Sequence, residues 1–371
     1  MLASFVGGWG HAEPLLGVAR LAAKRGHSVT FAGQAAVLPR VAALDFRTYT
    51  VGPDTLSSTR RPLVRIDRER ERTVVRDHFV GEFGQLRAGL LGRLIATERT
   101  DLVLCDEMDA GAIVAAEAAG LPCVTVAVVA AGRLTAPDII APSWDQLRRD
   151  NGLPADPRCT RFAGSVRLNP FPASFRDPAV STPFALHHVR PPILDEFGPP
   201  PAGRRGTRVY ATLGTVFDVE SGDLFSRLVR ALTRIDADSV LTIGSNVQRG
   251  ELPDAPERVR IEPYVPQREL LANCAAVICH GGSGTLAAAL SAGLPVVVLP
   301  MGADQPDNAD RCRDLGVGVV LDVTTAEPYD IADAIEEVVG DERYALAARD
   351  LAREAAAQPR PDDLQALAHL L

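Results

Sequence analysis

One glycine-rich stretch in the second half of the chain holds side chains and backbone groups well suited to binding an anion. It contains one histidine, three glycines and two hydroxyl residues: His280, Gly281, Gly282, Ser283, Gly284 and Thr285. An apolar run precedes the stretch and a helical pattern follows it, so we expect a strand, a loop and a helix start. Glycines let the backbone approach an anion closely, and the free N–H groups of a first helical turn favour negative charge. The histidine and the hydroxyls can add side-chain donors.

The stretch differs from the common nucleotide-binding loops. It lacks the Gly-Lys-Ser/Thr of a P-loop, and it lies about three quarters of the way along the chain, whereas a dinucleotide fingerprint normally opens its domain. A role in NAD binding or ATP hydrolysis is therefore not predicted. Taken alone, the stretch also fits an ordinary turn of small residues. The segments on either side of it are needed to distinguish an anion site from such a turn.

The elements around the loop predict an α/β protein with two Rossmann-like, doubly wound parallel sheets that face a cleft. Short apolar runs alternate with helical patterns in both halves, as in βαβ units. We expect the following divisions: a first domain at 1–190, a proline- and glycine-rich linker at 191–205, a second domain at 206–350, and C-terminal helices at 351–371 that pack back on the first domain. The ligand of such an arrangement lies where the carboxyl ends of the strands meet.

Composition narrows the range of partners. The 371 residues are 46% hydrophobic and carry a formal net charge of -8, which disfavours nucleic acid and anionic membranes. No window approaches the ~20 apolar residues of a membrane span, and the N-terminus lacks a basic region, so we expect a cytoplasmic protein without stable membrane insertion. The six cysteines form no CxxC pair, which favours reduced thiols and no cysteine metal site.

A mixed-charge segment at 60–77 interrupts the alternation of the first half. It is dense in arginine, with Asp67, Glu69 and Glu71 interspersed. A solvated helix face is the first interpretation and an anion-binding patch the second. In either case the segment is an insertion able to border a ligand site.

Three further motifs flank the glycine loop or stand at the N-terminus. They are Tyr264-Val265-Pro266-Gln267, the segment 301–309 with Asp304-Gln305, and Gly10-His11-Ala12-Glu13-Pro14. With the loop, they resemble the nucleotide-sugar-dependent glycosyltransferases of the GT-B fold, in the UDP-glycosyltransferase-like branch that includes bacterial macrolide and antibiotic glycosyltransferases. The resemblance extends over essentially the whole chain.

For the second domain, the resemblance implies a nucleotide-sugar site. Tyr264 would stack on the base, although the family often has tryptophan there, and Val265 and Gln267 would meet the base edge. The loop from His280 to Thr285 would hold the diphosphate, with Thr215 near it. Asp304 and Gln305 would bind hydroxyls of the donor hexose.

For the first domain, the resemblance implies an acceptor site with His11 as general base. A neutral imidazole can take the proton of a hydroxyl as that oxygen attacks the anomeric carbon. We expect the helix start at His11 to disfavour the imidazolium. Asp106 matches the aspartate that orients the base, while its neighbours Glu107 and Asp109 are alternative partners.

The expected function is inverting transfer of a hexose or deoxyhexose from a UDP- or TDP-sugar to a hydroxyl or carbon nucleophile of a small hydrophobic or aromatic natural product, as in antibiotic biosynthesis. We expect no cofactor and no metal, because His187-His188 and Asp236-Ala237-Asp238 lack the surroundings of a metal site. A UDP-sugar epimerase of the same fold and a non-catalytic auxiliary homologue remain alternatives. The donor, the acceptor and the oligomeric state, monomer or homodimer, stay open.

Overall fold

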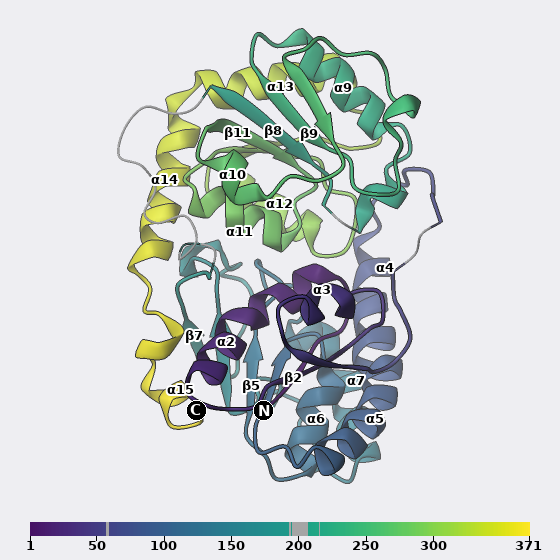
Figure 1. The fold of residues 1–371 in the computed structure, drawn as a ribbon, viewed down its shortest axis with the longest axis vertical. Helices are drawn as coiled ribbons and strands as arrows, with labels where there is room; N and C mark the ends of the chain where they lie inside the picture. The colour runs from purple at the N-terminus through teal and green to yellow at the C-terminus, as the bar shows by residue number, and fades with distance from the viewer. Residues whose placement is uncertain (57–58, 193, 195–206, 215) are drawn as a thin grey trace.

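The protein forms two α/β domains that lie one above the other along its longest axis (Figure 1). The structure is a computed structural model that describes residues 1–56, 59–192, 194, 207–214 and 216–371. Both domains have a parallel sheet with helices on its faces, as predicted from the alternating pattern. The predicted linker lies almost entirely outside the described residues.

The first domain contains a seven-stranded sheet in the order β3-β2-β1-β4-β5-β6-β7. Its strands are β1 (Leu2–Ser4), β2 (Thr30–Gly33), β3 (Arg47–Thr50), β4 (Val103–Asp106), β5 (Cys123–Val126), β6 (Val166–Asn169) and β7 (Leu186–His188). The order reverses between β1 and β4, which is the switch point of a doubly wound sheet. The central strands are buried on both faces, which explains their continuous apolar sequences.

The helices of the first domain cover both faces of this sheet (Figure 1). They are α1 (Trp9–Ala12), η1 (Glu13–Leu15), α2 (Leu16–Lys24), α3 (Leu38–Ala42), α4 (Arg68–Thr73), η2 (Val74–Phe83), α5 (Gly84–Thr97), α6 (Ala110–Ala118), α7 (Pro137–Asp150) and η3 (Ala173–Phe175). The consecutive helices α4, η2 and α5 place the mixed-charge segment at the top of the first domain, beside the second (Figure 1).

The second domain contains a six-stranded sheet in the order β10-β9-β8-β11-β12-β13. Its strands are β8 (Arg208–Thr212), β9 (Ser239–Thr242), β10 (Val259–Glu262), β11 (Cys274–Cys279), β12 (Val296–Val298) and β13 (Gly318–Val320). Its helices are η4 (Phe217–Glu220), α9 (Leu224–Arg234), η5 (Arg249–Glu251), α10 (Gln267–Leu271), α11 (Ser283–Ser291), α12 (Gln305–Asp314) and α13 (Pro328–Gly340). On α9, Leu224, Leu228 and Leu232 recur at helical spacing and are fully buried against the sheet.

The two domains also share apolar contacts. Phe171 and Phe175 of the first domain belong to the same buried cluster as Tyr210 and Val277 of the second. Burial of aromatic rings between domains stabilises their relative placement. A hydrogen bond also joins the loops that follow β5 and β11, so these loops approach each other at the carboxyl ends of the two sheets.

The C-terminal elements return from the second domain to the first (Figure 1). They are α14 (Glu342–Ala357), η6 (Pro361–Asp363) and α15 (Gln365–Ala368). Leu367 is fully buried in the core of the first domain, and His27 Nε2 lies 2.7 Å from the carbonyl oxygen of Leu371. The N- and C-termini consequently lie close together (Figure 1).

Several features bear on membrane and metal binding. Within the described ranges, no helix is long and apolar enough to cross a bilayer. Those ranges also contain no group of three or more His, Cys, Asp and Glu side chains that could hold a metal ion. His188 instead lies on β7, where its Nδ1 is 3.0 Å from Asn169 Nδ2. All six cysteines are buried and free.

Candidate active site

His11 lies where the first domain meets the second. It is part of α1, which continues through η1 into α2, so the expected helix start is present. Its ring packs against Gly7, where a Cβ would lie only 2.8 Å from His11 Cδ2, so that any other residue at position 7 would collide with the ring. The side chain is 27% exposed, which leaves the imidazole accessible to a reactant.

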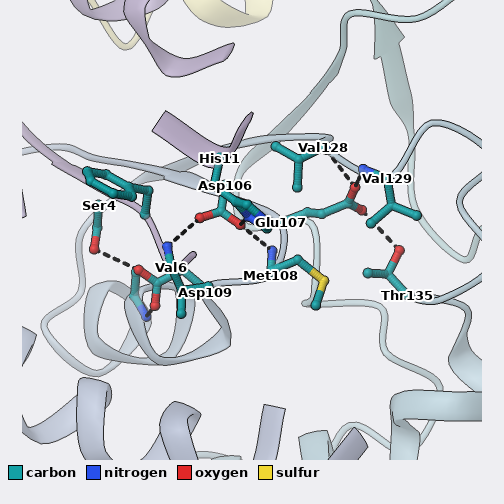
Figure 2. Close-up of polar contacts among 12 residues, drawn as sticks. Ser4, Val6, His11, Asp106, Glu107, Met108, Asp109, Val128, Val129 and Thr135 are labelled. Atoms are coloured by element: carbon teal, nitrogen blue, oxygen red, sulfur yellow. Dashed lines mark hydrogen bonds and ion pairs between the residues drawn. The ribbon is translucent and has the colours of Figure 1, made fainter. Parts of the chain in front are cut away.

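Three neighbouring carboxylates have separate partners (Figure 2). Asp106 Oδ1 lies 3.1 Å from His11 Nδ1, and the same carboxylate accepts bonds of 2.8 Å from the backbone N–H groups of Val6 and Met108. These contacts hold the Asp106 carboxylate in place and direct it at the His11 ring. Among the three carboxylates, Asp106 is therefore the partner of His11.

Glu107 and Asp109 have other roles (Figure 2). Glu107 is fully buried, accepts from the backbone N–H groups of Val128 and Val129, and pairs with Arg167 at 2.7 Å. Asp109 pairs with the buried Arg87 at 2.6 Å. Both carboxylates are thus engaged in neutralised, hydrogen-bonded networks that support the loops behind the base.

The electrostatics at His11 differ from the expectation based on the helix start. Burial lowers the pKa of His11, but the charge and hydrogen bond of Asp106, together with the charges of Asp304 and Glu107, outweigh burial. The net pKa lies above the usual 6.5. The helix start is present, but adjacent carboxylates favour the protonated form of the imidazole.

His280 ends β11 and begins the glycine loop. Its ring lies between Gly214 and Gly282, where a Cβ would be 2.7 Å and 2.4 Å from the ring. Burial lowers the pKa of His280 to about 4, so the ring is neutral at physiological pH. Its Nδ1 is buried and has no hydrogen-bond partner among the described residues. An unpartnered buried nitrogen is unfavourable and is consistent with a ligand that completes the site.

The helix after the loop offers its N-terminus. α11 begins at Ser283 and has Gly282 as N-cap, a residue without a side chain that could cap the first turn. Gly281 has a φ of 88°, a left-handed conformation that favours glycine. Gly284 is exposed and Thr285 half-buried at the same helix end. These residues supply the uncapped backbone groups expected of an anion site.

Ser283 has a different role from the one expected of a free phosphate donor. Its hydroxyl donates to Asp304 Oδ2 at 2.5 Å and accepts from the backbone N–H of Ala130 at 2.8 Å. Asn308 Nδ2 also lies 3.1 Å from this hydroxyl. The hydroxyl is consequently committed to a contact between the two domains, and the backbone amides of the helix start are the nearest groups that could bind an anion.

Asp304 and Gln305 are both anchored in this part of the structure. Asp304 accepts from Asn308 Nδ2 at 2.7 Å as well as from Ser283, and burial raises its pKa. Gln305 is 1% exposed, and its Oε1 accepts from the backbone N–H groups of Met301 and Gly302. The amide oxygen of Gln305 thus shapes the loop in which Asp304 lies.

Tyr264 follows β10 and is 60% exposed. The guanidinium carbon of Arg40, on α3, lies 5.9 Å from its ring centroid and 3.7 Å from that of Trp9. An exposed aromatic next to a stacked arginine presents a flat surface that a planar ring can cover. Val265 is half-buried, and Gln267 begins α10.

Two predicted features need separate mention. Thr215 lies outside the described residues. In the mixed-charge segment, Arg60, Arg61 and Arg68 pair with acidic residues of the second domain, while most of the segment stays exposed, as expected of a solvated face. Sequence reasoning missed this pairing, and it also missed Asn308, whose Oδ1 accepts from the backbone N–H of Ala131 at 3.0 Å.

Comparisons with known proteins agree with this geometry. Residues 226–370 match the family described as erythromycin biosynthesis protein CIII-like, C-terminal domain. The chain is 31% identical over 207 residues to 10-deoxymethynolide desosaminyltransferase of Streptomyces venezuelae, covering 54% of this chain and 48% of that protein. It is 34% identical over 212 residues to aclacinomycin-T 2-deoxy-L-fucose transferase of Streptomyces galilaeus, covering 54% and 47%.

Solved structures extend the likeness to the whole chain. The glycosyltransferase VinC in complex with dTDP superposes with a TM-score of 0.74 at 22% identity, over 100% of this chain and 99% of that one. The protein thus has the GT-B fold. The matches confirm the predicted resemblance to the antibiotic branch of the GT-B glycosyltransferases, while the chain aligns with only about half the length of these two curated relatives.

Proposed function

We propose that the protein is an inverting glycosyltransferase that uses a nucleotide sugar. The observation that carries the proposal is the juxtaposition of His11 and Asp106 on the first domain with Asp304 on the second, close enough for Asp304 to act on the pKa of His11. A base and a candidate sugar-binding carboxylate thus meet at one interdomain site. The names of the similar proteins support the same class of reaction.

In the proposed reaction, His11 Nε2 takes the proton of an acceptor hydroxyl as the oxygen attacks the anomeric carbon. The bond from Nδ1 to Asp106 fixes the tautomer with Nε2 unprotonated and stabilises the imidazolium that forms. The nucleoside diphosphate leaves from the opposite face in a single in-line step, which inverts the anomeric centre. For a carbon nucleophile, His11 would remove the acceptor proton in the same way.

On the donor side, the backbone amides at the start of α11 and the neutral His280 would hold the diphosphate, whose charge grows as it leaves. Thr285, half-buried at the same helix end, adds a hydroxyl. Tyr264 would stack on the base, and Asp304 would accept hydrogen bonds from hexose hydroxyls. We propose that no metal ion takes part.

The donor we propose to test first is a TDP-deoxyhexose, with UDP-hexoses as the second choice. Two similar proteins are named for transfer of desosamine and 2-deoxy-L-fucose, and a structural neighbour was solved with dTDP. We propose a small hydrophobic or aromatic natural product as acceptor.

The experiment is incubation of the purified protein with TDP- or UDP-sugars and a panel of polyketide and aromatic acceptors. Mass spectrometry should detect a glycoside and an equal amount of released nucleoside diphosphate. An isomerised sugar formed without acceptor would instead indicate an epimerase. Nucleotide binding without any turnover across the panel would indicate an auxiliary protein.

A further inference from the structure

The mixed-charge segment of the first domain crosses to the second domain and binds it. We call residues 59–73 the interdomain strap. Its backbone N–H at Arg61 donates to the carbonyl of Val219 at 2.7 Å, and Leu63 packs against the core of the second domain. Arg60 pairs with Glu251 and Arg61 with Glu220. The strap therefore belongs to the first domain by sequence and covers the second domain by contact.

Glu71 of the strap holds the residue that precedes Asp304. Its Oε2 accepts from the backbone N–H of Ala303 at 3.0 Å, and its Oε1 lies 3.6 Å from where a Cβ on Gly302 would stand. Ala303 has a φ of 53°, in the left-handed region that alanine rarely adopts. Such a conformation persists where neighbouring contacts hold it, often at functional sites. Glu71 makes one of these contacts.

Arg68, one helical turn before Glu71, holds the residues that follow Gln305. Its Nη2 donates to the carbonyl of Pro306 at 3.2 Å and to Asp310 at 2.6 Å, while its Nη1 donates to Asp307 at 2.7 Å. The helix α4 thus contacts the chain immediately before and immediately after the Asp304-Gln305 pair. Within the second domain, Asn308 also bonds to Asp304, at 2.7 Å.

We propose that Glu71 and Arg68 are positioning residues for donor-sugar recognition, contributed by the acceptor domain. They orient Asp304 toward the hexose, whereas the diphosphate and base contacts lie elsewhere. The inference rests on the proposed function, because it assigns hexose binding to Asp304. It predicts that the strap tunes affinity for the sugar part of the donor and leaves affinity for the bare nucleotide unchanged.

The test compares the Kd of TDP-glucose and UDP-glucose with that of TDP and UDP, by calorimetry on the full chain. For Glu71→Ala we expect about tenfold weaker binding of the nucleotide sugar, because the variant loses one hydrogen bond to a charged group. Binding of the nucleotide should stay within about twofold. Glu71→Gln keeps an acceptor for Ala303 and should recover most of the loss.

The matched control is Glu69→Ala, because Glu69 is exposed on the same helix and its ion pair, with Arg72 at 3.6 Å, lies within the strap itself. This variant should bind both the nucleotide sugar and the nucleotide with the wild-type Kd. Equal weakening of sugar and nucleotide binding by Glu71→Ala, or no weakening of either, would overturn the inference. Arg68→Gln provides a second measurement if Glu71→Ala folds poorly. Since binding needs no turnover, absence of transfer would count against the proposed function and leave this test intact.

Discussion

Replacing Asp106 by asparagine removes the charge behind His11 while keeping the size of the side chain. At 3.1 Å and an effective dielectric constant of about 20, an imidazolium and this carboxylate attract by about 5 kcal/mol. Desolvation of the buried carboxylate and the 27% exposure of His11 reduce the net effect. We expect a loss of about 2–4 kcal/mol in transition-state stabilisation, or roughly 30- to 1,000-fold in kcat.

The same variant should change the pH dependence in a defined direction. The base acts when neutral, so the wild-type rate should rise with pH through a midpoint above 6.5, the side to which the pKa of His11 is shifted. Without the charge and hydrogen bond of Asp106, burial lowers the pKa, and the midpoint should move to lower pH.

The assay is the pH profile of kcat/KM for glycoside formation, with thermal unfolding measured alongside. His78→Gln is the control, because His78 is exposed, pairs with Glu82 and should leave the profile unchanged. An Asp106→Asn profile with the wild-type midpoint and rate would refute the assignment of Asp106 as the partner of His11.

Three further predictions concern the donor side. Gly282→Ala would place a Cβ 2.4 Å from His280 Nε2, so nucleoside diphosphate binding should weaken at least about tenfold in calorimetry. Unchanged binding would argue against the glycine loop as the diphosphate site. Asn308→Ala leaves the Ala131 N–H without its partner and removes one of the two side-chain donors to Asp304, so it should lower the free energy of unfolding in urea by about 2–5 kcal/mol; a change under 1 kcal/mol would contradict this hydrogen-bond network. The pKa of His280, about 4 when folded, implies that the unfolded chain binds a proton first as pH falls. Stability should therefore decrease between pH 6.5 and 4 by about 3 kcal/mol from this residue, a loss that His280→Gln should lack in urea titrations at pH 7 and pH 4.5.

The sequence predicted the central strands well because they are buried on both faces. Three strands of the first sheet lack such a continuous apolar signal, and the physical reason differs among them. β3 lies at an edge, where its polar sequence Arg47–Thr50 is partly exposed, and β7 is the opposite edge strand. β6 contains Arg167, a residue whose burial depends on its ion pair with Glu107, far away in the chain.

At the site, the pairing of His11 with Asp106 was expected from the family resemblance, and the structure places Asp106 at the end of β4 with its carboxylate at the His11 ring. The position of the Ser283 hydroxyl was not, because its partner Ala130 lies in the other domain. The contacts of the strap were also beyond prediction, since Arg68 and Asp307 are separated by 239 residues and a charge pattern does not specify its partner. The Ser283 contact and the strap contacts join residues far apart in the sequence, so local sequence patterns do not predict them.

The central claim is that His11 is the base of a sugar transfer and has no part in holding the donor. The most direct measurement is a single-turnover comparison of wild type and His11→Ala with saturating nucleotide sugar and an acceptor that the wild type uses. If His11 is the base, we expect His11→Ala to bind the nucleotide sugar with the wild-type Kd and to form glycoside at least about 100-fold more slowly. Glycoside formation by His11→Ala at the wild-type rate would contradict it.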